Sequence, residues 1–142
     1  MSVRDFAEIS VGQELPEETV PLTRSDLVQY AGVSGDPNPI HWDDATAQKL
    51  GLPCAVAHGM LTMGIGAGYV TSWLGDPGAV TEYSVRFTSP VVVPNDGKGA
   101  VIVLTGKVKS VDEETRSAVV AIVAKVDDKK IFGRATATVR FG

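Results

Sequence analysis

One apolar segment, residues 60–74, constrains the fold of this chain more than any other part of the sequence. It is hydrophobic on nearly every side and contains three glycines: Gly64, Gly66 and Gly68. A helix without a polar face is stable only when other elements cover it. We therefore expect a buried central helix, and the glycines would let the covering strands approach it closely.

The C-terminal half of the chain has a composition typical of β-structure. Four segments are rich in the β-branched residues that favour strands: 80–90, 100–111, 118–126 and 130–141. Three clusters of turn residues mark the connections between them: 95–97, 112–114 and 127–129. Short connections of this kind predict antiparallel neighbours.

The N-terminal third predicts a short strand and two helices. A proline within residues 18–22 assigns that strand to a sheet edge, because proline has no N–H for the ladder. Thr23 and Asp26 form a capping pair that begins a helix ending near Gly35. Residues 43–50 are acidic at the start and basic at the end, as suits a second helix. The whole order predicts an α+β fold, with a curved antiparallel sheet wrapped around the central helix.

Length and composition favour a single domain over residues 1–142, because the chain is too short for two ordinary domains. Hydrophobic residues make up 44% and charged residues 21%, which argues against extended disorder. The net charge of −4 gives no reason to expect nucleic acid or an anionic bilayer as a partner. No long apolar run opens the chain, so we expect no signal peptide, no membrane span and a cytoplasmic location.

Cysteine and histidine are too few for a metal cluster at the usual ligand spacing. The chain has one cysteine, Cys54, and two histidines, His41 and His58. We expect Cys54 to be a small buried residue, with the alternative that it lines a site, and we expect no metal and no other cofactor. His58 is expected to be a hydrogen-bonded structural ring rather than a catalytic one.

The segment GDPNPIH at residues 35–41 carries the candidate chemistry. Its two prolines push the residues before them toward extended conformations, so the resulting bend can present Asp36 and His41 to one small substrate atom. Histidine exchanges protons near neutral pH, and a nearby carboxylate can hold a water or orient the ring. The pair therefore predicts addition or removal of water. Taken alone, the same residues would equally be a turn carboxylate and a surface histidine.

A wider pattern surrounds this pair. The string YAGVSGDPNPIHWDDATA at residues 30–47, followed by AHGM at 57–60, resembles the MaoC-like (R)-specific hydratases and dehydratases of the hot-dog superfamily. The strings LTMGIGAGYVTSWLGDPGAVTEYSVRF and VPNDGKGA extend the resemblance to the catalytic subunits of mycobacterial-type (3R)-hydroxyacyl-ACP dehydratases. The resemblance implies one hot-dog domain that pairs with a second hot-dog subunit, a different chain being favoured and an identical one remaining an alternative.

The same resemblance implies roles for four residues. Asp36 and His41 become the catalytic acid–base pair, Gly59 a backbone N–H donor to the thioester carbonyl, and Asn38 a support for the loop. Physical chemistry agrees for Gly59, since an N–H at the start of a helix is unpaired and lies at the positive end of the helix dipole. An enolate-like oxygen would be stabilised there.

The expected function is that of a hydro-lyase in type II fatty-acid or mycolic-acid elongation. It would reversibly dehydrate (3R)-3-hydroxyacyl thioesters, carried by acyl carrier protein or coenzyme A, to trans-2-enoyl thioesters. The alternatives are an (R)-specific enoyl-CoA hydratase, a non-catalytic subunit that only binds acyl thioesters, and a thioesterase.

Several further side chains have two interpretations. Six aromatic residues would be core residues or would line an acyl tunnel: Tyr30, Trp42, Tyr69, Trp73, Tyr83 and Phe87. Six cations would face water or meet a phosphate or an acidic carrier: Lys98, Lys107, Lys109, Lys129, Lys130 and Arg134. Three acidic residues are expected to be solvated or to cap helices: Asp43, Asp44 and Glu82.

Overall fold

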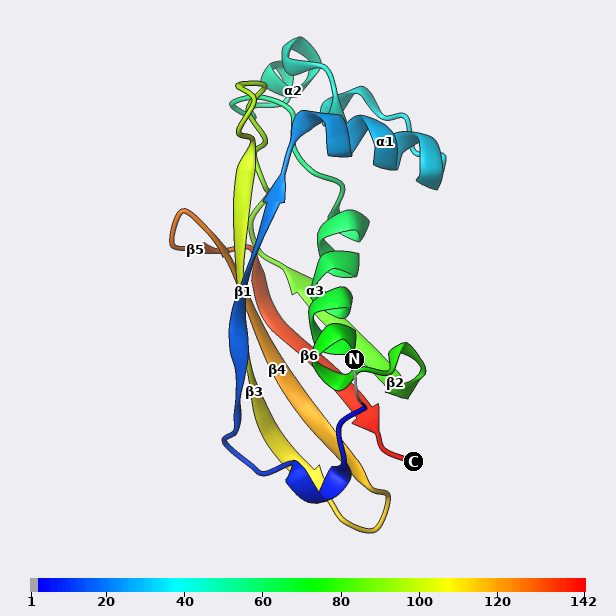
Figure 1. The fold of residues 1–142 in the computed structure, drawn as a ribbon. Coiled ribbons are helices and arrows are strands. Elements are labelled where there is room, and N and C mark those ends of the chain that lie inside the picture. The colour runs from blue at the N-terminus through cyan, green and yellow to red at the C-terminus, as the bar shows by residue number, and fades with distance from the viewer. Residues whose placement is uncertain (1–2) are drawn as a thin grey trace.

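The computed structural model describes residues 3–142 and contains one antiparallel sheet and three α-helices (Figure 1). The helices are α1 (Arg24–Ser34), α2 (Asp44–Lys49) and α3 (Gly59–Leu74). The strands are β1 (Glu14–Leu22), β2 (Val80–Phe87), β3 (Ala100–Asp112), β4 (Ser117–Val126), β5 (Lys129–Lys130) and β6 (Phe132–Arg140). Three short 3-10 helices complete it: Phe6–Glu8, Pro39–His41 and Pro77–Ala79.

The sheet wraps around α3, and its main strands lie in the order β1-β3-β4-β6-β2 (Figure 1). Burial alternates along β3 and β4, so that one face of the sheet packs on the helix and the other is partly open. From the helix, Tyr69, Val70 and Trp73 are buried against this face. The expected α+β architecture and the central helix are confirmed, but the helix is buried on one side only, since Met60, Gly64, Gly68 and Ser72 are exposed.

Helices α1 and α2 sit beyond the N-terminal end of α3 (Figure 1). The predicted capping box at Thr23 and Asp26 is present, with both reciprocal hydrogen bonds formed. Helix α1 runs on to Ser34 and ends at Gly35, whose φ of 72° is left-handed and therefore suits glycine. Within residues 3–142, no helix is long and apolar enough to cross a bilayer.

The strand pairing differs from the prediction at one connection. Strands β2 and β3 are not neighbours: β2 pairs with β6, and β3 lies between β1 and β4. The connecting segment, residues 88–99, is too long for a tight hairpin and runs beside the chain before α3, where Ala57 N–H donates to Val91 O at 2.9 Å and Val93 N–H to Ala55 O at 3.0 Å. This connection forms a wall of the candidate site instead of a turn.

Two strand boundaries also differ. Strand β1 begins at Glu14, earlier than the expected 18–22. The single strand expected over 130–141 is two strands, β5 and β6, separated at Ile131. Ile131 N–H donates to Ala124 O at 3.0 Å, and its buried side chain contributes to the core.

Only one of the three helix glycines permits a close approach. A Cβ added at Gly66 would lie 2.5 Å from the hydroxyl of Tyr83, which donates to Met63 O at 2.7 Å. Burial raises the pKa of Tyr83 to about 12, consistent with this enclosed position. Gly64 and Gly68 have nothing within 4 Å of an added Cβ, so the expectation is wrong for those two.

We predict that Gly66→Ala destabilises the protein by ~1–3 kcal/mol, because the new methyl group must displace Tyr83 from its hydrogen bond. The matched control Gly64→Ala should be neutral or stabilising, since alanine favours a helix and meets no atom there. Urea unfolding of both variants measures the difference. Equal stabilities would show that Gly66 has no packing role.

Candidate active site

The candidate loop is held by its own hydrogen bonds between α1 and α2. Asn38 begins the 3-10 helix Pro39–His41, where its side-chain oxygen accepts from Ile40 N–H at 3.2 Å. Asn38 N–H in turn donates to Asp36 Oδ1 at 3.3 Å. Trp42 Nε1 donates to Pro37 O at 2.9 Å across the bend. These contacts leave Asp36 Oδ2 as the carboxylate oxygen without a bond inside the loop.

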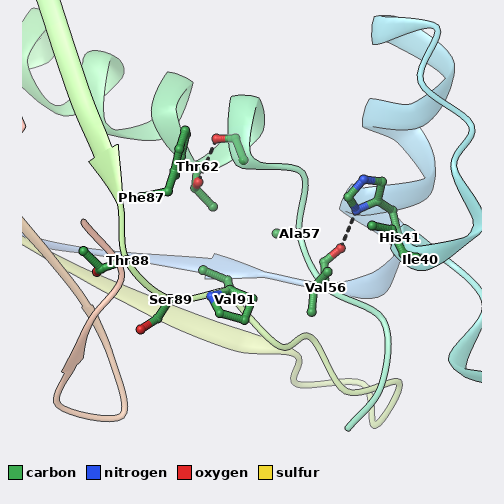
Figure 2. Close-up of a pocket in the computed structure, with 11 residues that line it drawn as sticks. Ile40, His41, Val56, Ala57, Thr62, Phe87, Thr88, Ser89 and Val91 are labelled. Atoms are coloured by element: carbon green, nitrogen blue, oxygen red, sulfur yellow. Dashed lines mark hydrogen bonds between the residues drawn. The ribbon is translucent and has the colours of Figure 1, made fainter. Parts of the chain in front are cut away.

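His41 is buried, with 7% of its surface exposed. Its Nδ1 lies 2.7 Å from Val56 O (Figure 2). A carbonyl only accepts hydrogen bonds, so Nδ1 carries the proton and Nε2 is the basic nitrogen of the neutral ring. A backbone contact fifteen residues away in sequence thus selects the tautomer.

His41 Nε2 and Asp36 Oδ2 are 3.9 Å apart. This separation is too long for a direct hydrogen bond, but a single oxygen atom can lie ~2.8 Å from both. The structure therefore brings the two predicted side chains to positions where they can share one water or hydroxyl group. The Asp36 side chain is 54% exposed, so this chain alone does not enclose the carboxylate.

His58 connects the two halves of the site. Its ring is 2% exposed and stacks on the His41 ring, with centroids 3.6 Å apart and planes inclined by 20°. Its Nε2 donates to Asp36 O at 3.1 Å, which confirms the expected hydrogen-bonded ring. Tyr30 meets the His58 ring edge-on, with ring centroids 4.8 Å apart. The Nδ1 atom of His58 is buried without a hydrogen-bond partner.

Gly59 is the first residue of α3, directly after His58. None of the hydrogen bonds found among residues 3–142 uses its N–H, which lies at the positive end of the α3 dipole. An added Cβ at Gly59 would lie 3.3 Å from the Phe87 ring, so a larger residue would press on that ring.

Two cavities meet at His41 and Gly59, the residues that line both. One, of about 380 Å³, is bounded mainly by apolar groups and extends along Phe87, Thr88 and Ser89 (Figure 2). The other, of about 330 Å³, contains Asp36 and His58. An elongated substrate could therefore cross from one cavity to the other with its central atoms between Asp36, His41 and the free N–H of Gly59.

The aromatic residues divide between core and cavity. Tyr30 and Phe87 line cavities, whereas Tyr69 and Trp73 are buried in the core. Trp42 does neither, since it is 47% exposed and lines neither of the two cavities.

Cys54 departs in part from its expected burial. It is half-buried, and partial burial raises the pKa of its thiol. It is not among the residues that line the two cavities, so the alternative of a site role finds no support.

An ion pair between Arg24 and Asp44 links the starts of α1 and α2 next to the candidate loop. Arg24, at the start of α1, donates to Asp44 Oδ1 at 2.7 Å and to Val93 O at 2.8 Å. Asp44 also accepts from Ala55 N–H at 2.9 Å, and this backbone bond followed by Arg24 holds the pKa of the carboxyl below its usual 3.8. The Asp44 side chain is 42% exposed, so the expected solvation is partly present, but the expectation missed its structural ion pair. Sequence reasoning missed this contact because its partners are distant along the chain.

Donor atoms of Asp36, His41 and His58 lie within 4.8 Å of one another, which sequence spacing did not predict. The two imidazoles are stacked, so their in-plane lone pairs run side by side instead of converging on one ion. One nitrogen of each ring already donates to a carbonyl. The arrangement fits proton handling better than metal binding.

We predict that Asp44→Asn lowers the thermal unfolding temperature at neutral pH, because the neutral amide weakens the Arg24 contact. The folded pKa of Asp44 is lowered, so its contribution is present above 3.8 and is lost as the pH falls through the folded value. The difference in unfolding temperature between Asp44→Asn and the unsubstituted protein should become smaller between pH 5 and pH 2. Thermal unfolding monitored by circular dichroism measures it. The control is Glu113→Gln, which changes an exposed carboxylate. If the difference in unfolding temperature for Asp44→Asn did not vary with pH, the stabilising role of the ionised Asp44 carboxylate would be contradicted.

The sequence of this chain matches a known protein family. The model of the MaoC like domain matches residues 6–128. An (R)-specific enoyl-CoA hydratase of Rhodospirillum rubrum is 33% identical over 104 residues, covering 72% of this chain and 71% of that protein. The 3-hydroxyacyl-thioester dehydratase X of Mycobacterium tuberculosis is 35% identical over 79 residues, 56% of this chain and 27% of its own length. This chain therefore spans about a quarter of that relative.

Solved structures of similar fold support the same family. A MaoC-like dehydratase superposes with a TM-score of 0.95 and 53% identity, over 99% of this chain and 43% of that one. The C-terminally truncated HadBC (3R-hydroxyacyl-ACP dehydratase) complex of Mycobacterium tuberculosis matches with a TM-score of 0.68 and 18% identity, over 90% of this chain and 95% of that one, which shows a shared fold alone. The named relatives are hydratases or dehydratases, hence hydro-lyases. By sequence and by fold, the chain belongs to the MaoC-like dehydratase family.

Proposed function

We propose that this domain reversibly dehydrates (3R)-3-hydroxyacyl thioesters to trans-2-enoyl thioesters, as the catalytic subunit of a type II dehydratase of the mycolic-acid kind. The observation that carries the proposal is the meeting of His41 Nε2, Asp36 Oδ2 and the free Gly59 N–H at the junction of two cavities. The hydrogen bonds around Asn38 support its expected role of holding the loop.

The chemistry follows from these positions. The thioester carbonyl accepts a hydrogen bond from Gly59 N–H, which stabilises the negative oxygen that develops when His41 Nε2 removes the C2 proton. The C2=C3 double bond forms as the C3–O bond breaks. Asp36, in its protonated form, holds the hydroxyl by a hydrogen bond and gives it the proton with which it leaves as water. In the reverse direction the pair positions and deprotonates water.

The proposal includes a second subunit. The Asp36 side chain is 54% exposed and Met60, beside the same cavity, is 64% exposed, so a covering surface would exclude water from the reacting atoms. Strands β1 and β2 end the sheet and offer open edges. The HadBC match favours a different hot-dog chain as partner, and an identical chain is the alternative. Native mass measurement, alone and with a candidate partner, decides between them.

A second candidate is an (R)-specific enoyl-CoA hydratase. The Rhodospirillum rubrum relative favours it, because the match covers 72% of this chain and 71% of that protein. Both reactions would use the same residues, so only the carrier and chain-length preference separates them. A cytoplasmic location remains a prediction under either.

We predict that Asp36→Asn and His41→Ala each lower kcat by about 10²- to 10⁴-fold, the usual contribution of a positioned acid or base. The measurement is the hydration of trans-2-enoyl thioesters, monitored as the decrease in absorbance of the enoyl group. Asp43→Asn, which changes a nearby carboxylate outside both cavities, should keep activity. Near-normal rates in both test variants would refute the assignment, and release of free thiol would indicate a thioesterase.

A further inference from the structure

The β4–β5 hairpin places two lysines opposite each other. Lys125 and Lys130 are Cα partners in the antiparallel pair, and Lys129, the Cα partner of Val126, lies next to the turn. Like charges directly opposite each other destabilise a sheet. Among residues 3–142, the ion pairs are Arg24–Asp44 and the long Asp36–His41 contact, so neither lysine is neutralised by a carboxylate. The turn also carries Asp127 and Asp128, so the hairpin keeps only a small net positive charge, and in the part of the chain that the structure describes no ion pair joins its lysines to these carboxylates.

Two arginines extend this charge across the sheet. Arg86 precedes Phe87 at the end of β2, and its side chain lies along Gly133 of β6, with Cδ 3.7 Å from an added Cβ. Arg134 follows Gly133 and is exposed. We call these five cations the basic surface: Arg86, Lys125, Lys129, Lys130 and Arg134. They gather on a chain whose net charge is −4. Lys107, another of the cations considered from sequence, lies elsewhere. It is on β3, and its Cα partner is Ala121 of β4.

The basic surface adjoins the larger cavity. Thr88 N–H donates to Ile131 O at 3.0 Å, and Thr88 Oγ1 donates to Lys130 O at 3.3 Å. Thr88 also lines the cavity that reaches His41 (Figure 2). Figure 2 shows Thr88 and Ser89 at the side of the cavity away from His41. One residue thus joins the end of the cavity to the hairpin that carries the charge.

The distribution of the cations indicates the kind of partner. They come from four strands, β2, β4, β5 and β6, that meet near the β5 hairpin, which projects from the sheet (Figure 1). A single phosphate is held best by groups that converge on it, whereas a spread of positive charge complements a folded acidic surface and speeds its encounter. An acidic protein is therefore the better fit.

We propose that the basic surface docks an acyl carrier protein, whose acidic face approaches the β4–β5 hairpin while its thioester arm enters the cavity past Thr88 and Ser89. This inference rests on the proposed dehydratase function, because the carrier would deliver the substrate of that reaction to the site. It assigns the delivery side of the cavity to β2, β5 and the residues that follow β2.

The test is the double variant Lys125→Gln/Lys130→Gln in the assembled enzyme. With a carrier-linked substrate at low salt, KM should rise roughly tenfold with kcat within about twofold, the combined effect of two exposed charge contacts. The difference should disappear at high salt because such contacts are screened. The matched control Lys107→Gln/Lys109→Gln removes the same charge from β3 and should leave KM unchanged. The unfolding temperature of the test variant should stay the same or rise, because the opposed lysines no longer repel.

Three substrates separate the outcomes. The N-acetylcysteamine thioester carries neither phosphate nor protein, so absence of its turnover by the parent enzyme would refute the proposed function itself. Turnover with an unchanged carrier KM in the test variant would refute only the docking surface. A coenzyme A thioester should show little change; an equal rise of KM for coenzyme A and for the carrier would mean that the lysines bind the shared phosphate, which overturns the carrier assignment.

Discussion

Burial of α3 is the constraint on which the rest of this structure depends. The helix has no polar face, so the sheet must curve around it, and Tyr69, Val70 and Trp73 contribute to the core that results. The same burial places the start of the helix at the meeting point of two cavities. Because the first turn of a helix has unpaired N–H groups, packing of the core delivers a preorganised donor at Gly59 to the site.

The proposed acid and base, Asp36 and His41, depend on contacts made far from the loop that carries them. Val56 O selects the proton position on His41, and His58 stacks on that ring while it holds Asp36 O. Arg24 and Asp44 tie the surrounding helices to the connection after β2. Each contact joins segments that meet only when the chain wraps around α3, so the geometry of the site is a product of the whole fold.

Much of the architecture could be predicted because it follows from local chemistry. The Thr23–Asp26 capping box, the central helix and the alternating strands each have a signal within a few residues. Strand order could not be predicted, because residues 88–99 carry no signal for which strand they reach. The three glycines of α3 are alike in sequence, yet only Gly66 faces a neighbouring ring. Asp44 looked like a capping residue because its partner Arg24 is twenty positions earlier in the chain.

The sequence by itself determined the α+β class, the loop bearing Asp36 and His41 and the resemblance to the hydratases, because propensity, capping and motif spacing act within short stretches of chain. Only the tertiary structure decided the 3.9 Å separation of the two side chains, the free nitrogen of His41 and the joining of a basic hairpin to the cavity wall. Those properties arise between residues distant in sequence, and they are set by how the sheet curves and which strands pair, which no short stretch encodes.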